Sequence, residues 1–288
     1  MIGKKQKAIL LIIASAFFFS ILNMFIRLAG DLPSIQKSFF RNAIASVFAG
    51  ILLVKERNSI NVRKNDVPIL IARSVLGTIG ILGNFYAVDH LILADATMLN
   101  KMSPFFAILF SLIFLKEGVS LFQALMVVGA FIGSLFIIKP SFSNANLLAS
   151  LVGVAGGLGA GGAYTCVRAL GKRNVSRTLI VLFFSLFSCM VTLPAFIFDY
   201  HPMTGMQLLY LILAGLSAAG GQFSITAAYA YAPARDISVY DYSQILFSAV
   251  IGFFVFADQP DGWSVLGYFV IIAMAILMFL HDQKAADK

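Results

Sequence analysis

A lysine in the middle of an apolar segment is the feature of this sequence that most needs a chemical explanation. Lys101 lies roughly ten residues into the stretch Leu91–Leu115, about 15 Å along a helix and too deep to reach either surface of a bilayer. A charge at the bilayer centre costs roughly 2.5–3.5 kcal/mol, so this lysine requires a partner or a function. Pro104 removes a backbone hydrogen bond to the carbonyl of Asn100, which predicts a bent helix with an opened turn. Lys101 is therefore a candidate for binding a carboxylate or phosphate, with a structural ion pair as the alternative.

Asp241 is the predicted partner of Lys101. An offset of 140 residues aligns Ser103 with Ser243 and makes Asp241 the counterpart of Lys101. The two charges could bind each other in an empty site and the opposite ends of a zwitterion in an occupied one. Two alternatives stay open, namely that Asp241 titrates and couples transport of a solute to protons, or that the pair is purely structural.

Two arginines and several uncharged polar residues also lie inside apolar segments. Arg41 lies beside Asn42 in the outer part of its segment, and Arg73 begins a stripe at helical spacing that ends at Asn84. Arg73 is either a gate residue or an anchor at the inner surface. The other candidates for binding a substrate are Asn100, Gln222, Thr226, Tyr229, Tyr240, Tyr242 and Gln244.

These residues must be positioned by membrane helices, because apolar segments fill almost the whole chain. Hydrophobic residues make up 60% and charged residues 12% of the 288 residues, against roughly 45–50% and 25% in soluble domains. The segments are continuously apolar and lack the alternation of barrel strands, so the predicted fold class is an all-α membrane protein. Ten segments are long enough to span a bilayer: Ala8–Leu28, Ser34–Val54, Val67–Val88, Leu91–Leu115, Leu121–Ile138, Leu147–Leu170, Thr178–Phe198, Met206–Ala230, Ser238–Ala257 and Trp263–His281.

The net charge of +8 encodes topology and does not predict a nucleic-acid partner. Lysines and arginines cluster in every second connection, and Lys139 is the one basic residue of the opposite connections. This positive-inside pattern predicts a multi-pass protein of the cytoplasmic membrane with both termini in the cytoplasm. Cys166 and Cys189 both fall within spans, which favours packed thiols over a disulfide framework.

The two halves of the chain resemble each other. Asp95 through Glu117 parallels Asp236 through Asp258, each a polar entry followed by an apolar run that ends in an acid. Five spans in each half is an odd number, so the second half must be inverted relative to the first. The sequence predicts a repeat over residues 1–140 and an inverted repeat over 147–283, an organisation typical of secondary transporters with a midplane site.

The motifs of the fourth predicted span also carry a family resemblance. The patterns Ala94-Asp95-Ala96-Thr97, Ser103-Pro104-Phe105-Phe106 and Phe114-Leu115-Lys116-Glu117 resemble the EamA-type branch of the drug/metabolite transporter superfamily. The second copy departs from the pattern, with Gln244 where Pro104 stands. The resemblance implies ten helices and transport of a small metabolite without ATP, and it leaves the substrate open.

The favoured hypothesis is a secondary transporter in which the two halves rock around a central site. An intramembrane enzyme is the distant alternative, but no catalytic, cofactor-binding or metal-binding motif is visible, and the three histidines fall at helix ends. A channel lacks a recognisable filter motif. A matched Asp241 and Lys101 favour an amino acid or amino-acid-like zwitterion, with an organic anion or nucleotide-linked metabolite as the alternative.

Overall fold

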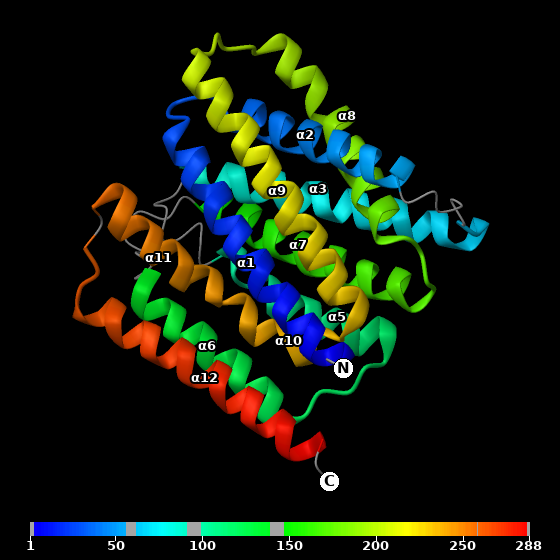
Figure 1. Cartoon of the computed structure of the whole chain (residues 1–288), viewed down its shortest axis with the longest axis vertical. Helices are drawn as coiled ribbons and strands as arrows, with labels where there is room; N and C mark the ends of the chain where they lie inside the picture. Colours follow the sequence, from blue (N-terminus) through cyan, green and yellow to red (C-terminus); the bar gives the residue numbers. More distant parts are fainter. Residues whose placement is uncertain (1–2, 56–61, 91–98, 139–146, 258, 287–288) are drawn as a thin grey trace.

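Apolar helices make up the fold (Figure 1). The computed structural model describes residues 3–55, 62–90, 99–138, 147–257 and 259–286, and these ranges contain helices and turns but no strand. The helices are α1 (Lys4–Leu28), α2 (Ser34–Lys55), the short 3-10 helix η1 (Lys64–Asp66), α3 (Val67–His90), α5 (Ser103–Leu115), α6 (Leu121–Ile138), α7 (Leu147–Lys172), α8 (Arg177–Phe198), α9 (Gly205–Tyr231), α10 (Ala234–Asp241), α11 (Ser243–Phe256) and α12 (Gly262–Ala286).

The expected membrane architecture is present in the described part of the chain. Eight helices are long and apolar enough to cross a membrane when α10 and α11 are taken as one, and Ser103–Leu115 and Leu121–Ile137 are two shorter apolar helices. Large apolar side chains are exposed on the outer surface, among them Phe114, Phe198 and Phe254. Contiguous exposed apolar surface of this kind fits contact with lipid.

Most helix boundaries follow the predicted spans, but the fourth and ninth spans are interrupted. The first part of the fourth span, residues 91–98, lies outside the described residues; Lys101 and Met102 then form a turn before α5 begins. Pro104 stands in the first turn of α5, where its missing N–H removes no helical hydrogen bond. The prediction that Pro104 bends a continuous helix was therefore wrong, because the proline starts a new one.

The ninth span is interrupted at the corresponding place. A single residue in a turn, Tyr242, separates α10 from α11. No proline stands there. The predicted span Ser238–Ala257 corresponds to the candidate membrane span Ala234–Phe256, which the turn at Tyr242 divides into α10 and α11. The first interruption directly precedes α5 and the second lies between α10 and α11, and such helix ends leave backbone carbonyls without helical partners.

Helix packing brings distant parts of the chain together. Helix α3 packs on α7, α1 on α9, α2 on α8, and α6 on α12; α6 and α12 form one edge of the molecule in Figure 1. The glycine-rich stretch Gly156–Gly162 of α7 lets α7 and α3 pack closely. A Cβ on Gly159 would lie 2.7 Å from the carbonyl oxygen of Leu76, and one on Gly83 would lie 2.8 Å from the Cα of Gly156.

Candidate functional site

A central cavity of about 170 Å³ lies where the interrupted helices meet the long ones. Eight of the predicted site residues line it, namely Arg41, Arg73, Asn84, Asn100, Lys101, Gln222, Asp241 and Gln244. They come from α2, α3, α9, α10, α11 and the turn before α5. The cavity is smaller than the roughly 300–1,000 Å³ of pockets for drug-sized ligands, so it suits a small metabolite.

The structure brings Lys101 and Asp241 together, as the offset of the two copies predicted. The Lys101 Nζ lies 3.4 Å from the Asp241 Oδ2, and it donates a shorter hydrogen bond of 2.7 Å to the Gln244 Oε1. Both charged side chains are almost fully buried, with 5% and 8% of their surfaces exposed. A buried ammonium and carboxylate compensate each other's charge, which allows both to remain in the apolar bundle.

The two helix interruptions are also joined to each other through their backbones. The Lys101 Nζ donates to the free carbonyl oxygen of Asp241 at 3.4 Å. In return, the Tyr242 hydroxyl donates to the carbonyl oxygen of Lys101 at 3.1 Å. Each interruption is therefore closed by a side chain from the other, and the carbonyls that the turns expose are not left without a donor.

Arg73 is the most deeply buried cation of the cavity. Only 2% of the residue is exposed, and its Nε and Nη1 atoms have no hydrogen-bond partner. Its guanidinium carbon lies 3.7 Å from the centre of the Phe184 ring, and a Cβ at Gly77 would collide with its Nη1 atom. The missing side chain at Gly77 and the Phe184 ring therefore hold the guanidinium in place by packing and a cation–π contact.

Arg41 is the second arginine of the cavity and has a weak partner. Its Nη1 donates to the Asn42 Oδ1 at 3.4 Å, near the upper limit of hydrogen-bond distance. Among the described residues, no carboxylate lies within ion-pair distance of Arg41 or Arg73. Asn42 is therefore a neighbour of Arg41 and does not itself line the cavity.

Four other predicted site residues lie behind the cavity wall. Thr226 accepts a hydrogen bond from the Gln222 amide at 3.2 Å, and the Tyr229 ring stacks on Tyr164 with centroids 4.6 Å apart. Tyr240 is buried in the core, and Tyr242 binds the Lys101 carbonyl. These residues support groups that line the cavity, and none of them lines it directly.

Several residues that line the cavity were not among the site residues predicted from the sequence. Tyr164 on α7 and Phe184 on α8 both border the cavity, as do Phe19, Leu22 and Asn23 on α1. Tyr164 follows the glycine-rich stretch, and its position beside small residues was the available signal. For Phe184 no local signal existed, because an aromatic residue in an apolar helix is indistinguishable from core in the sequence.

Ion pairs link the helix ends on the side of the termini. The Glu117 Oε1 lies 3.0 Å from the Arg168 Nε and 2.7 Å from the Lys172 Nζ. Arg168 also donates to the carbonyl of Ala230 at the end of α9. Its partly buried side chain therefore connects Glu117 to the end of α9. Asp236 pairs with Lys5 on α1 at 3.6 Å.

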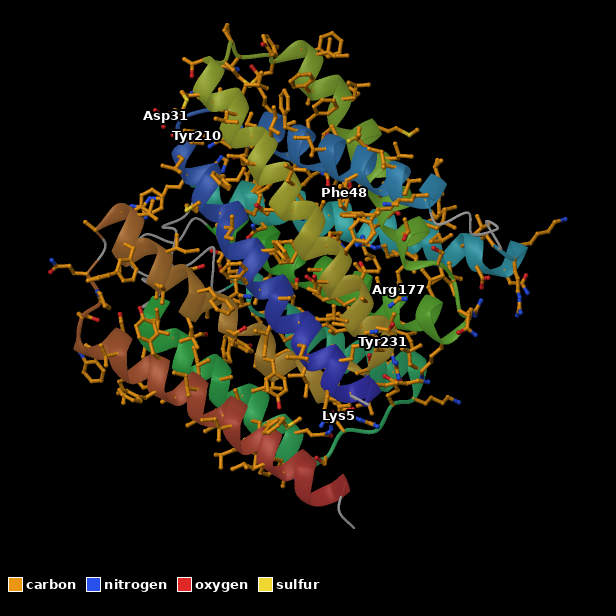
Figure 2. The ribbon with its side chains drawn as sticks, in the orientation of Figure 1. Lys5, Asp31, Phe48, Arg177, Tyr210 and Tyr231 are labelled. Atoms are coloured by element: carbon orange, nitrogen blue, oxygen red, sulfur yellow. The ribbon has the colours of Figure 1, made fainter. Side chains whose placement is uncertain are left out.

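The two ends of the bundle can be followed in Figure 2. Lys5, Arg177 and Tyr231 lie toward the end that carries both termini, and the Arg177 guanidinium stands over the Tyr231 ring at 4.8 Å. Asp31 and Tyr210 lie toward the opposite end. Ion pairs and cation–π contacts thus connect α1, α7, α8 and α9 at the end with the termini.

Comparisons with known proteins agree with this architecture. A solved crystal structure superposes with a TM-score of 0.84 over 96% of this chain and 98% of its own. At 14% sequence identity, this likeness shows the fold alone. The model of the EamA-like transporter family matches residues 6–139.

Curated relatives extend the match to nearly the whole chain. The pseudopaline exporter of Pseudomonas aeruginosa strain UCBPP-PA14 is 31% identical over 95% of this chain and 96% of its own. The human solute carrier family 35 member G1 is 26% identical over 90% of this chain and 75% of its own. The S-adenosylmethionine uptake transporter of Rickettsia felis is 23% identical over 89% of this chain and 86% of its own. The chain therefore belongs to the EamA-like transporter family of the drug/metabolite transporter superfamily, and it is a multi-pass membrane transporter.

Proposed function

We propose that the protein is a secondary transporter that moves a small amino-acid-like metabolite across the cytoplasmic membrane by alternating access. The observation that carries this proposal is the ion pair of Lys101 and Asp241 in the wall of the cavity. The ammonium and the carboxylate offer one site for each end of a zwitterion. Gln244 adds a neutral acceptor for the Lys101 ammonium at 2.7 Å.

The packing of the helices supports two inverted repeats over residues 1–140 and 147–283. In this arrangement α7 of the second repeat is the counterpart of α1 in the first, and α9 is the counterpart of α3. Exchanging the repeats then turns the α3–α7 contact into the α9–α1 contact, and both contacts are present. The contacts of α5 with α7 and of α11 with α1 correspond in the same way. A two-fold relation of this kind places a site between the repeats, as in other transporters built from inverted repeats.

Two interrupted helices at the cavity fit the same mechanism. Discontinuous helices supply free backbone groups at the midplane, and substrates or coupling ions can bind these groups. Here the free carbonyls of Lys101 and Asp241 are held by side chains of the facing interruption. A substrate that engages Lys101 and Asp241 would change both hydrogen bonds at once, which ties occupancy of the site to the arrangement of α10 and α11.

The relatives support transport of a small molecule, and their names are compatible with the proposed class of metabolite. One relative is named for the uptake of S-adenosylmethionine, a derivative of the amino acid methionine. Another is named as an exporter of pseudopaline. One name describes uptake and the other export, so the relatives are compatible with either direction of transport here.

Counterflow in proteoliposomes tests the proposal. Vesicles preloaded with an unlabelled amino acid are expected to accumulate the labelled amino acid, whereas vesicles preloaded with an organic anion are not expected to accumulate the labelled anion. Lys101→Ala and Asp241→Asn should abolish this exchange, whereas Asp199→Asn should not, because Asp199 is an exposed residue paired with His201. Exchange of dicarboxylates or phosphates that Asp241→Asn does not affect would replace the proposal with an anion carrier.

The membrane orientation is tested with single cysteines. In a chain without Cys166 and Cys189, a cysteine at Asn174 is expected to react only with reagents from the cytoplasmic side. A cysteine at Tyr200, in the connection at the opposite end, is expected to react from outside. The reverse pattern would contradict cytoplasmic termini and the positive-inside interpretation.

A further inference from the structure

The charges that line the cavity do not balance. Three cations, Arg41, Arg73 and Lys101, and one carboxylate, Asp241, line it within the described part of the chain. This is a net charge of plus two on buried side chains around a small cavity. Unpaired charges in a low-dielectric interior are unfavourable, so an occupant with negative charge would relieve the imbalance.

Lys101 is not the source of the excess. Its ammonium already contacts the Asp241 carboxylate, the Asp241 carbonyl and the Gln244 amide oxygen. Its short hydrogen bond goes to the Gln244 Oε1 at 2.7 Å, and the Asp241 carboxylate at 3.4 Å compensates its charge. The excess positive charge therefore belongs to Arg41 and Arg73.

The Arg73 guanidinium is held in place by packing, and two of its nitrogen atoms have no hydrogen-bond acceptor. Its Nε and Nη1 atoms are buried and have no hydrogen-bond partner, and the Phe184 ring holds the plane of the guanidinium at 3.7 Å. A guanidinium presents its donors as a planar fork that matches the two oxygens of a carboxylate. Arg73 also lines the cavity, so a ligand that enters it would lie beside a guanidinium with two unpartnered donors.

Arg41 offers a second position for an anion. Only 9% of the residue is exposed, and its Nη1 donates to the neutral amide of Asn42 at 3.4 Å. Arg41 stands on α2 and Arg73 on α3, so the two guanidiniums reach the cavity from different helices. A substrate with a single carboxylate would satisfy one of them and leave the other uncompensated.

We infer, on the basis of the proposed function, that the substrate is an amino-acid derivative with at least two carboxylates, which Arg41 and Arg73 bind. Its ammonium is directed toward Asp241, and its net negative charge compensates the two arginines. Lys101 then holds Asp241 and the helix interruptions in position, and the arginines determine the preference for anionic over plain zwitterionic amino acids.

L-Glutamate and L-glutamine are matched probes, because they share size and shape and differ by one carboxylate. Thermal unfolding of the purified full chain is measured with each probe at constant ionic strength, with L-2-aminoadipate as a longer dicarboxylate and sulfate as a plain dianion. Glutamate or aminoadipate is expected to raise the melting temperature at concentrations about tenfold lower than glutamine does, because its second carboxylate can form charge-assisted hydrogen bonds. Sulfate is expected to raise the melting temperature above a chloride control.

Three variants connect these shifts to the site. Arg41→Gln and Arg73→Gln are expected to lose the shifts caused by glutamate and by sulfate. Arg27→Gln is the matched control, because Arg27 contacts the Phe256 ring and does not line the cavity; it should keep both shifts. Equal stabilisation by glutamine and glutamate, no shift with any anion, or shifts unchanged in Arg73→Gln would each overturn the inference.

Counterflow separates this inference from the proposed function. If sulfate and dicarboxylates without an amine stabilise the protein through Arg41 and Arg73 but amino acids are neither bound nor exchanged, the amino-acid part of the proposed function fails and the arginine site stands. If amino acids with one carboxylate are exchanged as well as those with two, the proposed function stands and the inference fails.

Discussion

The hydroxyl of Tyr242 donates a hydrogen bond to the backbone carbonyl of Lys101 at 3.1 Å, so a residue in one helix interruption closes the other. Both residues are buried. A buried carbonyl that loses its donor costs about 1–3 kcal/mol. The contact is therefore a structural tie between two short helices that lie far apart in the sequence.

Tyr242→Phe is expected to destabilise the protein by about 1–3 kcal/mol, because it removes the donor and keeps the ring. The measurement is thermal or denaturant unfolding in detergent. Tyr200→Phe, at an exposed position, is the control and should leave stability unchanged. Equal stability of Tyr242→Phe and the parent protein would show that water or another donor replaces the hydroxyl.

Lys101→Ala is expected to abolish substrate binding and to destabilise the protein by about 3–5 kcal/mol, because the Asp241 carboxylate loses its buried partner. Lys101→Arg should also fail to bind substrate, since a planar fork does not replace a compact ammonium. The double variant Lys101→Met with Asp241→Asn should recover most of the stability without recovering transport. Unfolding and counterflow measured on the same preparations check this, and a transport-competent double variant would reduce the ion pair to a structural role.

Glu117→Gln is expected to loosen the end of the bundle that carries both termini, because Glu117 forms ion pairs with Arg168 and Lys172 there. A cysteine placed at Ala230, which Arg168 contacts through its carbonyl, reports on this opening in a chain without native cysteines. Maleimide labelling from the side of the termini should become faster in Glu117→Gln. Asp199→Asn at the opposite end is the control, and identical labelling rates in all three proteins would exclude Glu117 as a closure residue.

Gly159→Leu is expected to destabilise the α3–α7 contact by about 1–3 kcal/mol or more, the usual range for overpacking. Its Cβ would lie 2.7 Å from the carbonyl oxygen of Leu76, which belongs to the backbone and cannot rotate away. Gly50→Leu is the matched control, because no atom lies within 4 Å of its Cβ position. The yield of monodisperse protein and the melting temperature measure the effect; similar values for the two variants would show that α3 and α7 can separate without loss of stability.

The spans could be predicted from sequence because bilayer thickness fixes the length of an apolar helix, whatever its neighbours. The interruption at Lys101 had a partial signal in Pro104, whereas the one at Tyr242 had none. There the helix breaks among tertiary hydrogen bonds, which local propensity does not encode. The charged site residues could be predicted because charges inside a membrane are costly. Phe184 could not, since its role depends on the Arg73 guanidinium above its ring.

The packing of α7 against both α3 and α5, and of α1 against both α9 and α11, has a consequence for the biogenesis of the protein. Each of these two groups of helices contains members from both halves of the chain. The first half is synthesised and inserted before the second half exists. Until α7 to α11 are inserted, α1, α3 and α5 therefore lack these packing partners, and Lys101 lacks the Asp241 carboxylate. The group of α3, α5 and α7 can therefore form as soon as α7 is inserted, whereas α1 and Lys101 obtain their partners only when α9, α10 and α11 follow.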